Sequence, residues 1–484
     1  MSEEKTFSYQ TRLQADLFIE KVLEEYATLY GHVERSLCRD LLKGLLLNDL
    51  KRDYIAKYKI TARQFNACRV SVLGKISAIK ESRKQRIPSL KEKIKTLTKK
   101  ISKIKSALVK HQKKRKLDNL EKRLAKEEKD HKEGNISLCF GGKKLFHSQF
   151  HLEENGYSSF EEWKEDYTKE RNSEIFCLGS HDETAGNQSC VLTLQDETFC
   201  LRLRLPNTAR EKHKTKYLLI SDIRFVYGKE EILTALKNKQ ALSYRFKKDE
   251  KGWRVFVSFS IEKPAVTTKQ ALGGIGIDIN VNHIALTEID SQGNPVHKKS
   301  IPLSTYGKSK DRAKAFIRDV AKEIVAFAKE KKKPIIAEKL DFTKKKATLK
   351  EDNKGRARML SSFSYSHILE SIERRAFKEG VEYLSVSPAC TSIIGKIKFS
   401  KRYGLTAHHA AALCIARRFF KFSEAPSKCP MKVVHKNVQV TCPLPARNRE
   451  QHVWVFWIGA YRKLKAALAA HFRVSPGPAH ARPG

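Results

Sequence analysis

The chain has 484 residues, which is enough for two to four domains of ordinary size. Its 96 Lys and Arg residues outnumber 54 Asp and Glu residues, so the net charge is +42 and we expect a polyanion such as nucleic acid as partner. A hydrophobic content of 40% excludes a wholly disordered basic tail. No apolar run is long enough to span a membrane and MSEEKTFSYQ contains no secretion signal, so we expect no membrane partner and a cytoplasmic location.

The chain contains ten cysteines, and none of them form the closely spaced pairs that are typical of zinc sites. This spacing argues against a zinc ribbon and against a disulfide framework. We expect reduced thiols that pack as small hydrophobic side chains.

Residues 12–150 carry apolar residues at helical spacing, and we predict a helical domain over 1–165. Within it, the apolar residues from Ile87 to Leu108 follow the repeat of a short coiled coil, and the polar run HQKKRK at 111–116 predicts the turn of a helical hairpin. Residues 83–132 hold 20 Lys and Arg against six Asp and Glu, which favours contact with phosphates over a merely solvated coiled coil. The predicted nucleic-acid contacts here are Lys93, Lys99, Lys103, Lys113 and Arg115.

Between 173 and 265, short alternating runs predict the strands of a small antiparallel barrel or sandwich. Leu201 and Leu203 alternate with Arg202 and Arg204, which predicts one apolar face and one basic face that contacts nucleic acid. Three aromatic residues either stack on bases or fill the core, and alternation on a strand favours the core: Trp253, Phe256 and Phe259.

The next segment, 270–425, has the strand and helix order of an RNase H-like α/β domain. Three consecutive strands are predicted at 274–280, 283–290 and 295–302. They are followed by a helix at 309–331, a strand at 333–340, a helix at 361–378, a strand at 381–387 and a helix at 406–420. The whole chain is therefore predicted to be a multidomain α+β protein.

Two carboxylates interrupt apolar strands of this segment, Asp278 in the first and Glu338 in the fourth. A buried carboxylate is costly without a partner, and clustered carboxylates hold Mg²⁺ in enzymes that cleave phosphodiesters. No Asp or Glu occurs between 383 and 423, so a third carboxylate cannot come from the last strand or helix. His408 and His409 begin that helix, and they either ligate metal and position phosphate or form a structural pair.

The runs GIGIDIN, IIAEKLDFTKKK, SPACTSIIG and AHHAAALCIARR resemble, in order and spacing, the split RuvC motifs of the TnpB family. These are RNA-guided nucleases of bacterial insertion sequences, related to compact type V CRISPR effectors. The resemblance implies a helical recognition lobe at 1–165 inserted in or preceding a wedge domain, and an oligonucleotide-binding β-barrel wedge at 173–265. It implies a RuvC-like nuclease domain at 270–425. The remaining residues, 426–484, are expected to form a basic C-terminal extension, and the Pro/Ala-rich composition of SPGPAHARPG predicts a disordered tail.

The resemblance also implies activity and partners. Asp278 and Glu338 match the carboxylates of the first two motifs, and His408 stands where the family usually has Asp. The family's zinc element is missing, and the segment in its place adds the predicted nucleic-acid contacts Lys396, Lys398 and Arg402. We therefore expect two Mg²⁺ ions, no structural zinc, a guide RNA and a double-stranded DNA target, with one protein bound to each guide RNA in a bacterial cytoplasm.

A basic loop beside Glu338 is predicted either to hold the displaced DNA strand or to form a flexible solvated lid; its predicted contacts are Lys344, Lys345, Arg356 and Arg358. Two other functions share most of these features. One is a nuclease-dead, guide-directed repressor that binds DNA, and the other is an RNA-binding protein or nuclease without a guide.

Overall fold

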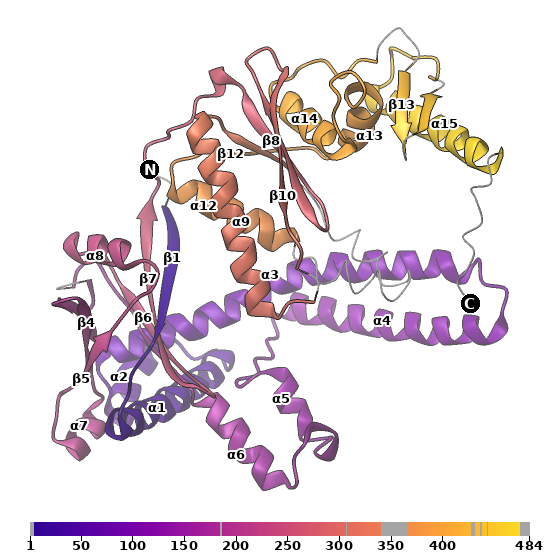
Figure 1. Ribbon diagram of the computed structural model, residues 1–484. Coiled ribbons are helices and arrows are strands. Elements are labelled where there is room, and N and C mark those ends of the chain that lie inside the picture. The colour runs from indigo at the N-terminus through magenta and orange to yellow at the C-terminus, as the bar shows by residue number, and fades with distance from the viewer. Residues whose placement is uncertain are drawn as a thin grey trace, which may run out of the picture. The chain divides into compact units, whose positions relative to one another are not determined.

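The computed structural model divides the chain into two compact units, Met1–Glu262 and Lys263–Gly484 (Figure 1). The structure describes residues 4–183, 186–305, 307–339, 365–426, 431–435, 438–442 and 444–474. The predicted contacts Lys344, Lys345, Arg356 and Arg358, and the tail after 474, lie outside the described residues. Within the described part, none of the helices combines the length and apolar character that crossing a bilayer requires.

A four-stranded antiparallel sheet organises the first unit. Its order is β1 (Glu4–Arg12), β7 (Gly252–Glu262), β6 (Ser243–Asp249) and β2 (Glu174–Cys177). The strand β1 was not predicted: residues 1–165 were expected to form a helical domain, with helical spacing recognised only from residue 12. Because β1 and β2 belong to one sheet, the helices between them are an insertion within that sheet.

A second, three-stranded antiparallel sheet consists of β3 (Cys190–Gln195), β4 (Thr198–Arg204) and β5 (Tyr217–Ile223). The helices α7 (Asn207–His213) and α8 (Lys229–Lys237) flank β5 in sequence. The predicted alternation holds, because Leu201 and Leu203 are fully buried while Arg202 is exposed. Trp253 and Phe259 are buried in the core that both sheets share, so they are not available to stack on bases.

The helical insertion contains α1 (Leu17–Leu42), α2 (Leu47–Tyr58), α3 (Ala62–Ile101), α4 (Ala107–Glu133), α5 (Lys143–Ser148) and α6 (Phe160–Arg171). Figure 1 shows α3 and α4 as a long antiparallel hairpin. The turn lies at 102–106 rather than at the predicted 111–116, and the polar run HQKKRK is part of α4. The buried seam of α3 ends at Ile101, and Arg83 binds Glu127 across the hairpin, so packing sets the turn instead of polarity.

A five-stranded mixed sheet organises the second unit. Its strands are β8 (Gly274–Ile279), β9 (His283–Ile289), β10 (Pro295–Pro302), β11 (Ile335–Glu338) and β12 (Tyr383–Val386). The order is β10-β9-β8-β11-β12; the first three strands are antiparallel, and β11 runs parallel to both β8 and β12. The order of strands along the chain agrees with the sequence prediction, and their bounds agree to within a few residues.

Helices cover both faces of this sheet. The core on one face is built with α9 (Lys310–Lys331) and α12 (Tyr365–Lys378). On the other face α14 (Ala407–Phe419) packs against the strands, and the same hydrophobic core includes residues of the short helix α13 (Thr391–Ile394), the π-helical turn Gly395–Phe399 and α15 (Val453–Val474). The hairpin of β13 (Met431–His435) and β14 (Val438–Cys442) precedes α15. Since Trp457 of α15 is fully buried, this helix of the C-terminal extension contributes to the core of the unit.

Candidate functional site

Two glycines let α14 approach β8 closely. A Cβ atom added at Gly276 would lie 1.9 Å from the carbonyl oxygen of Ala412, and one added at Gly274 would lie 2.9 Å from the ring of Phe420. These glycines therefore face α14. Side chains alternate along a strand, so Asp278 faces the same helix.

The carboxylate of Asp278 lies beside the imidazole ring of His408, which is in the first turn of α14. The Nδ1 atom of His408 lies 3.2 Å from Oδ2 of Asp278, and the amide of Asn280 donates to the same oxygen at 3.0 Å. The side chain of His408 is 49% exposed and that of Asp278 is 13% exposed. The Asp278 carboxylate is thus largely withdrawn from water, while the imidazole beside it remains open to a ligand.

Glu338 comes to the same face from β11. In the parallel pairing of β11 with β8, Ile336 is the partner of Gly276. Glu338 and Asp278 are each two residues further along their strands, so they occupy corresponding positions on the same face of the sheet. Thr391, which is 1% exposed, donates a hydrogen bond from its hydroxyl to the Glu338 carboxylate. Burial raises the pKa of Tyr365, and the carboxylates of Glu338 and Asp278 raise it further. Both carboxylates therefore lie close enough to the Tyr365 hydroxyl to affect its charge.

His409 takes a different place from His408. It is buried, its Nδ1 atom lies 2.8 Å from the Thr406 hydroxyl, and its Nε2 atom lies 3.2 Å from the Ser300 hydroxyl and 3.3 Å from the Lys299 carbonyl. Burial lowers the pKa of His409, although the Lys299 carbonyl raises it. These contacts occupy both ring nitrogens, so of the two alternatives for His409 they favour the structural one.

Sequence reasoning missed a third imidazole at this site. The ring of His283, at the start of β9, packs edge to face on His408, with 4.9 Å between centroids and 80° between planes. Burial lowers the pKa of His283, as does His408, while Asp278 raises it. The sequence could have indicated this residue, because His283 follows the first strand after a short turn and the antiparallel strand β9 runs back beside Asp278.

The donors around Asp278 match one mode of divalent-cation binding. Among the described residues, no three His, Cys, Asp or Glu side chains come together as a group that could hold a metal ion. Mg²⁺, however, is bound in many enzymes by only one or two carboxylates together with water and substrate phosphates. Asp278 and Glu338 supply such a pair of oxygen ligands, and the residues present fit Mg²⁺ in that mode.

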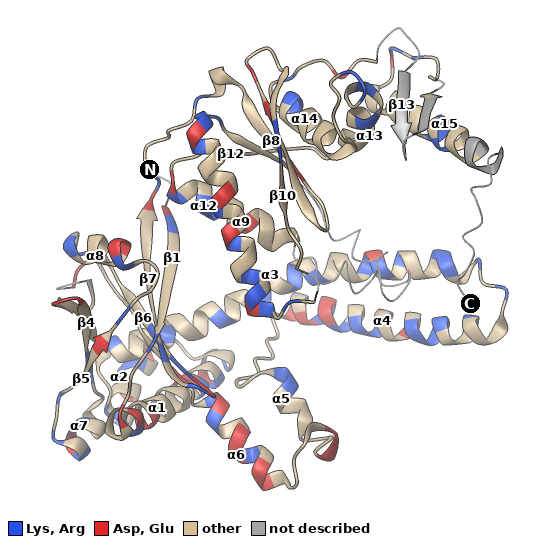
Figure 2. Cartoon of the chain, viewed as in Figure 1, with Lys and Arg blue, Asp and Glu red and all other residues tan. Residues whose placement is uncertain are grey.

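The predicted nucleic-acid contacts differ in their surroundings. On the α3–α4 hairpin, Lys99, Lys103 and Arg115 are exposed while Lys93 and Lys113 are half-buried, and Figure 2 shows basic residues along both helices. In the second sheet of the first unit, the guanidinium of Arg202 is exposed and lies 4.8 Å from the Tyr217 ring, and Arg204 is half-buried.

The three predicted contacts in the π-helical segment and after it are less uniform. Burial lowers the pKa of Lys396, and burial together with Arg417 lowers that of Lys398. The Nζ atom of Lys398 donates to the Ser423 carbonyl at 2.9 Å, whereas Arg402 is exposed with its guanidinium 5.2 Å from the Tyr403 ring. Of these three, Arg402 is therefore the most accessible to a phosphate.

No family model matches the chain, and no curated protein sequence matches it. Solved structures that are similar include T. thermophilus RuvC in complex with a Holliday junction substrate, at 16% identity over 31% of this chain and 94% of that chain, with a TM-score of 0.22. A CRISPR-Cas12f ternary complex matches at 13% identity over 85% of this chain and 98% of that chain, with a TM-score of 0.22. A Cas12i1 R-loop complex before target DNA cleavage matches at 9% identity over 71% of this chain and 61% of that chain, with a TM-score of 0.29.

Proposed function

We propose that this protein is an RNA-guided, Mg²⁺-dependent DNA endonuclease with an RNase H-like catalytic domain. One observation carries the proposal: Asp278 of β8 and Glu338 of β11 face α14 at corresponding positions of neighbouring strands, with His408 beside Asp278. The sheet order β10-β9-β8-β11-β12, with three antiparallel strands followed by two parallel ones, supports the RNase H-like assignment.

In this proposal, Asp278 and Glu338 would hold the metal together with a phosphate of the substrate. Bound Mg²⁺ would supply an activated water and stabilise the leaving oxygen. The donors Asn280 and Thr391 fix the orientation of the two carboxylates, as outer partners of metal ligands do. The exposed ring of His408 is placed to contact the phosphate or to accept a proton beside Asp278.

Two arguments support a guide RNA as partner: the net positive charge of the chain and its resemblance to the TnpB family. A net charge of +42 suits a protein that covers the phosphates of a structured RNA and of an RNA–DNA duplex. In such proteins base pairing selects the sequence, while the protein contacts the backbone and a short motif beside the target. We propose one protein for each guide RNA.

The direct test is to isolate the protein with its RNA, sequence that RNA, and assay cleavage of a matching DNA duplex with Mg²⁺. Asp278→Asn and Glu338→Gln should abolish cleavage and leave RNA binding intact, and His408→Ala should slow cleavage. Asp319→Asn, the same change on the exposed side of α9, is the matched control and should cut normally. Normal cleavage by Glu338→Gln would refute the site.

A second candidate is a guided DNA-binding protein without nuclease activity. It is favoured by the imidazole of His408, which takes the place where a third carboxylate would otherwise strengthen metal binding. Under this alternative the wild type binds target DNA but does not cut it at any Mg²⁺ concentration, and His408→Asp gains cleavage. If no defined RNA accompanies the protein, the remaining alternative is an RNA-binding protein or nuclease without a guide.

A further inference from the structure

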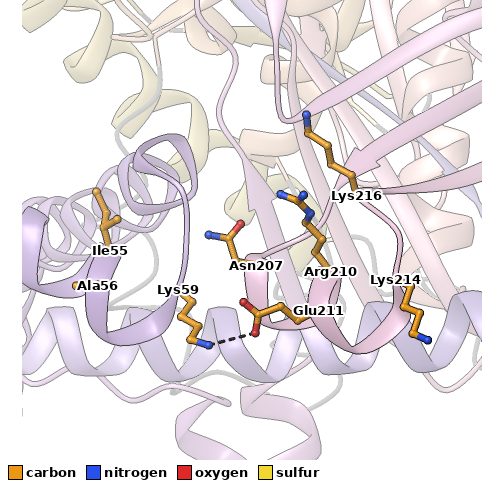
Figure 3. Close-up of a pocket in the computed structure, with 8 residues that line it drawn as sticks. All are labelled: Ile55, Ala56, Lys59, Asn207, Arg210, Glu211, Lys214 and Lys216. Atoms are coloured by element: carbon orange, nitrogen blue, oxygen red, sulfur yellow. Dashed lines mark hydrogen bonds and ion pairs between the residues drawn. The ribbon is translucent and has the colours of Figure 1, made fainter.

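A basic pocket of about 890 Å³ lies in the first unit, and none of its lining residues belongs to the candidate catalytic site (Figure 3). Its walls are the end of α2, the short helix α7 and the residue before β5. The lining residues are Ile55, Ala56, Lys59, Asn207, Arg210, Glu211, Lys214 and Lys216. None of these eight side chains is aromatic, so the pocket offers charge and hydrogen bonds but no surface for stacking a base.

Backbone hydrogen bonds hold the walls together. The amide of Asn207 donates to the carbonyl of Lys59 at 3.0 Å, which joins the start of α7 to the end of α2. The amide of Leu205 donates to the carbonyl of Lys216 at 3.1 Å, which joins the segment before α7 to the start of β5. The pocket is thus formed before any ligand arrives, and binding would cost little ordering of the backbone.

The charges of the pocket are poorly balanced. Lys59 pairs with Glu211 at 3.1 Å, and both side chains are more than half exposed. Within the part of the chain that the structure describes, Arg210, Lys214 and Lys216 have no carboxylate at ion-pair distance, and all three are exposed. In Figure 3, Arg210 lies between Asn207 and the two lysines, Lys214 and Lys216, which stand on the side of the pocket opposite Ile55 and Ala56.

The same short helix shows the contrasting arrangement on its other side. Lys212 lies 2.6 Å from one oxygen of Glu25, and His213 lies 2.7 Å from the other. Burial raises the pKa of Glu25, but its bonds to Lys212 and then His213 outweigh this, and the net effect lowers it. The basic side chains on one side of α7 are therefore paired with a carboxylate of the protein, whereas those that line the pocket are not.

We propose that this pocket binds backbone phosphates of the guide RNA. Arg210 presents the planar fork that pairs with two phosphate oxygens, and the flanking lysines act as mobile point charges for neighbouring phosphates. Glu211 limits the affinity, because its carboxylate repels the ligand and occupies Lys59. This inference depends on the proposed function only for the identity of the nucleic acid, since duplex DNA carries the same phosphodiester chemistry.

The test uses the full chain and two probes of mixed sequence, a labelled 30-nucleotide single-stranded RNA and a 30-base-pair DNA duplex. Binding is measured between 50 and 300 mM salt for wild type and for the triple variant Arg210→Gln, Lys214→Gln, Lys216→Gln. We expect RNA affinity to fall about tenfold or more and the slope of log K against log salt to fall by about 2, at roughly 0.7 for each phosphate that the protein no longer neutralises. The matched control Lys212→Gln, on the same helix, should change the slope little.

Glu211→Gln is a second test, because removing the repelling carboxylate should raise RNA affinity several-fold. A gain of affinity cannot be explained by misfolding, as a loss in the triple variant could be. Equal RNA binding by wild type and triple variant at every salt concentration overturns the inference. A loss for DNA alone also overturns the assignment to the guide. Asp278→Asn separates this inference from the catalytic proposal, because it should bind both probes normally and fail only to cut.

Discussion

The close packing of α14 on β8 makes Gly276→Ala a sensitive test of the candidate site. The added methyl group would lie 1.9 Å from the carbonyl oxygen of Ala412, and an ordinary C···O contact is about 3.3 Å. The helix must therefore move by about 1.4 Å, or the strand must. Either movement would take His408 from 3.2 Å to about 4 Å or more from Asp278, beyond hydrogen-bond distance.

Two measurements follow from that displacement. Overpacking of this kind costs about 1–3 kcal/mol, so the free energy of unfolding should fall by that amount. Misplacement of catalytic groups by about 1 Å costs about a hundredfold in rate, so cleavage of a guide-matched duplex should slow accordingly while RNA binding persists.

Gly74→Ala is the matched control. Gly74 lies within α3 with no heavy atom within 4 Å of an added Cβ, so this change should stabilise the helix by about 0.5–1 kcal/mol and leave cleavage unchanged. Wild-type stability and cleavage in Gly276→Ala would refute the close approach of α14 and with it the geometry of the site.

Three further predictions test other contacts. Arg83→Met should destabilise the α3–α4 hairpin by about 3 kcal/mol, because the 7% exposed guanidinium binds a buried carboxylate of α4; hydrogen exchange of the hairpin amides measures it, and unchanged protection would contradict it. Thr391→Val should raise the Mg²⁺ concentration needed for cleavage about tenfold, since Glu338 loses its donor, while Thr391→Ser should behave as wild type. Hydrogen bonds from Arg12 hold the pKa of Asp249 at about 2, below its ordinary 3.8. This stabilisation is complete above pH 3.8 and is lost as the pH falls through about 2, so urea unfolding of wild type and Asp249→Asn should differ at pH 5 and converge near pH 2; a constant difference would contradict the pairing.

The sequence was most informative where one physical pattern dominated. Strands β8, β9 and β11 are short, mostly apolar and buried runs, and the charge of Asp278 within such a run marked the site. Alternation likewise identified the basic and apolar faces around Leu201.

Other features depend on contacts between distant residues. The run that forms β1 has no partner until Phe259 and its neighbours in β7, far along the chain, come beside it. The hairpin turn depends on the buried ion pair of Arg83 with Glu127, which spacing cannot reveal. The roles of His408 and His409 depend on the rotation of α14, since adjacent helical residues point about 100° apart and only one can face Asp278.

The central claim is that Asp278 and Glu338 bind a divalent cation together with the phosphate that is cut. The most direct measurement is cleavage of a target with a single sulfur in place of oxygen at that phosphate, in Mg²⁺ and then in the more sulfur-tolerant Mn²⁺. The wild type should cleave this target much more slowly than the unmodified one in Mg²⁺, and its cleavage rate should recover in Mn²⁺. Asp278→Asn should cleave it with neither metal. Wild-type cleavage that is indifferent to the sulfur and the metal, or undiminished cleavage by Asp278→Asn, would contradict the claim.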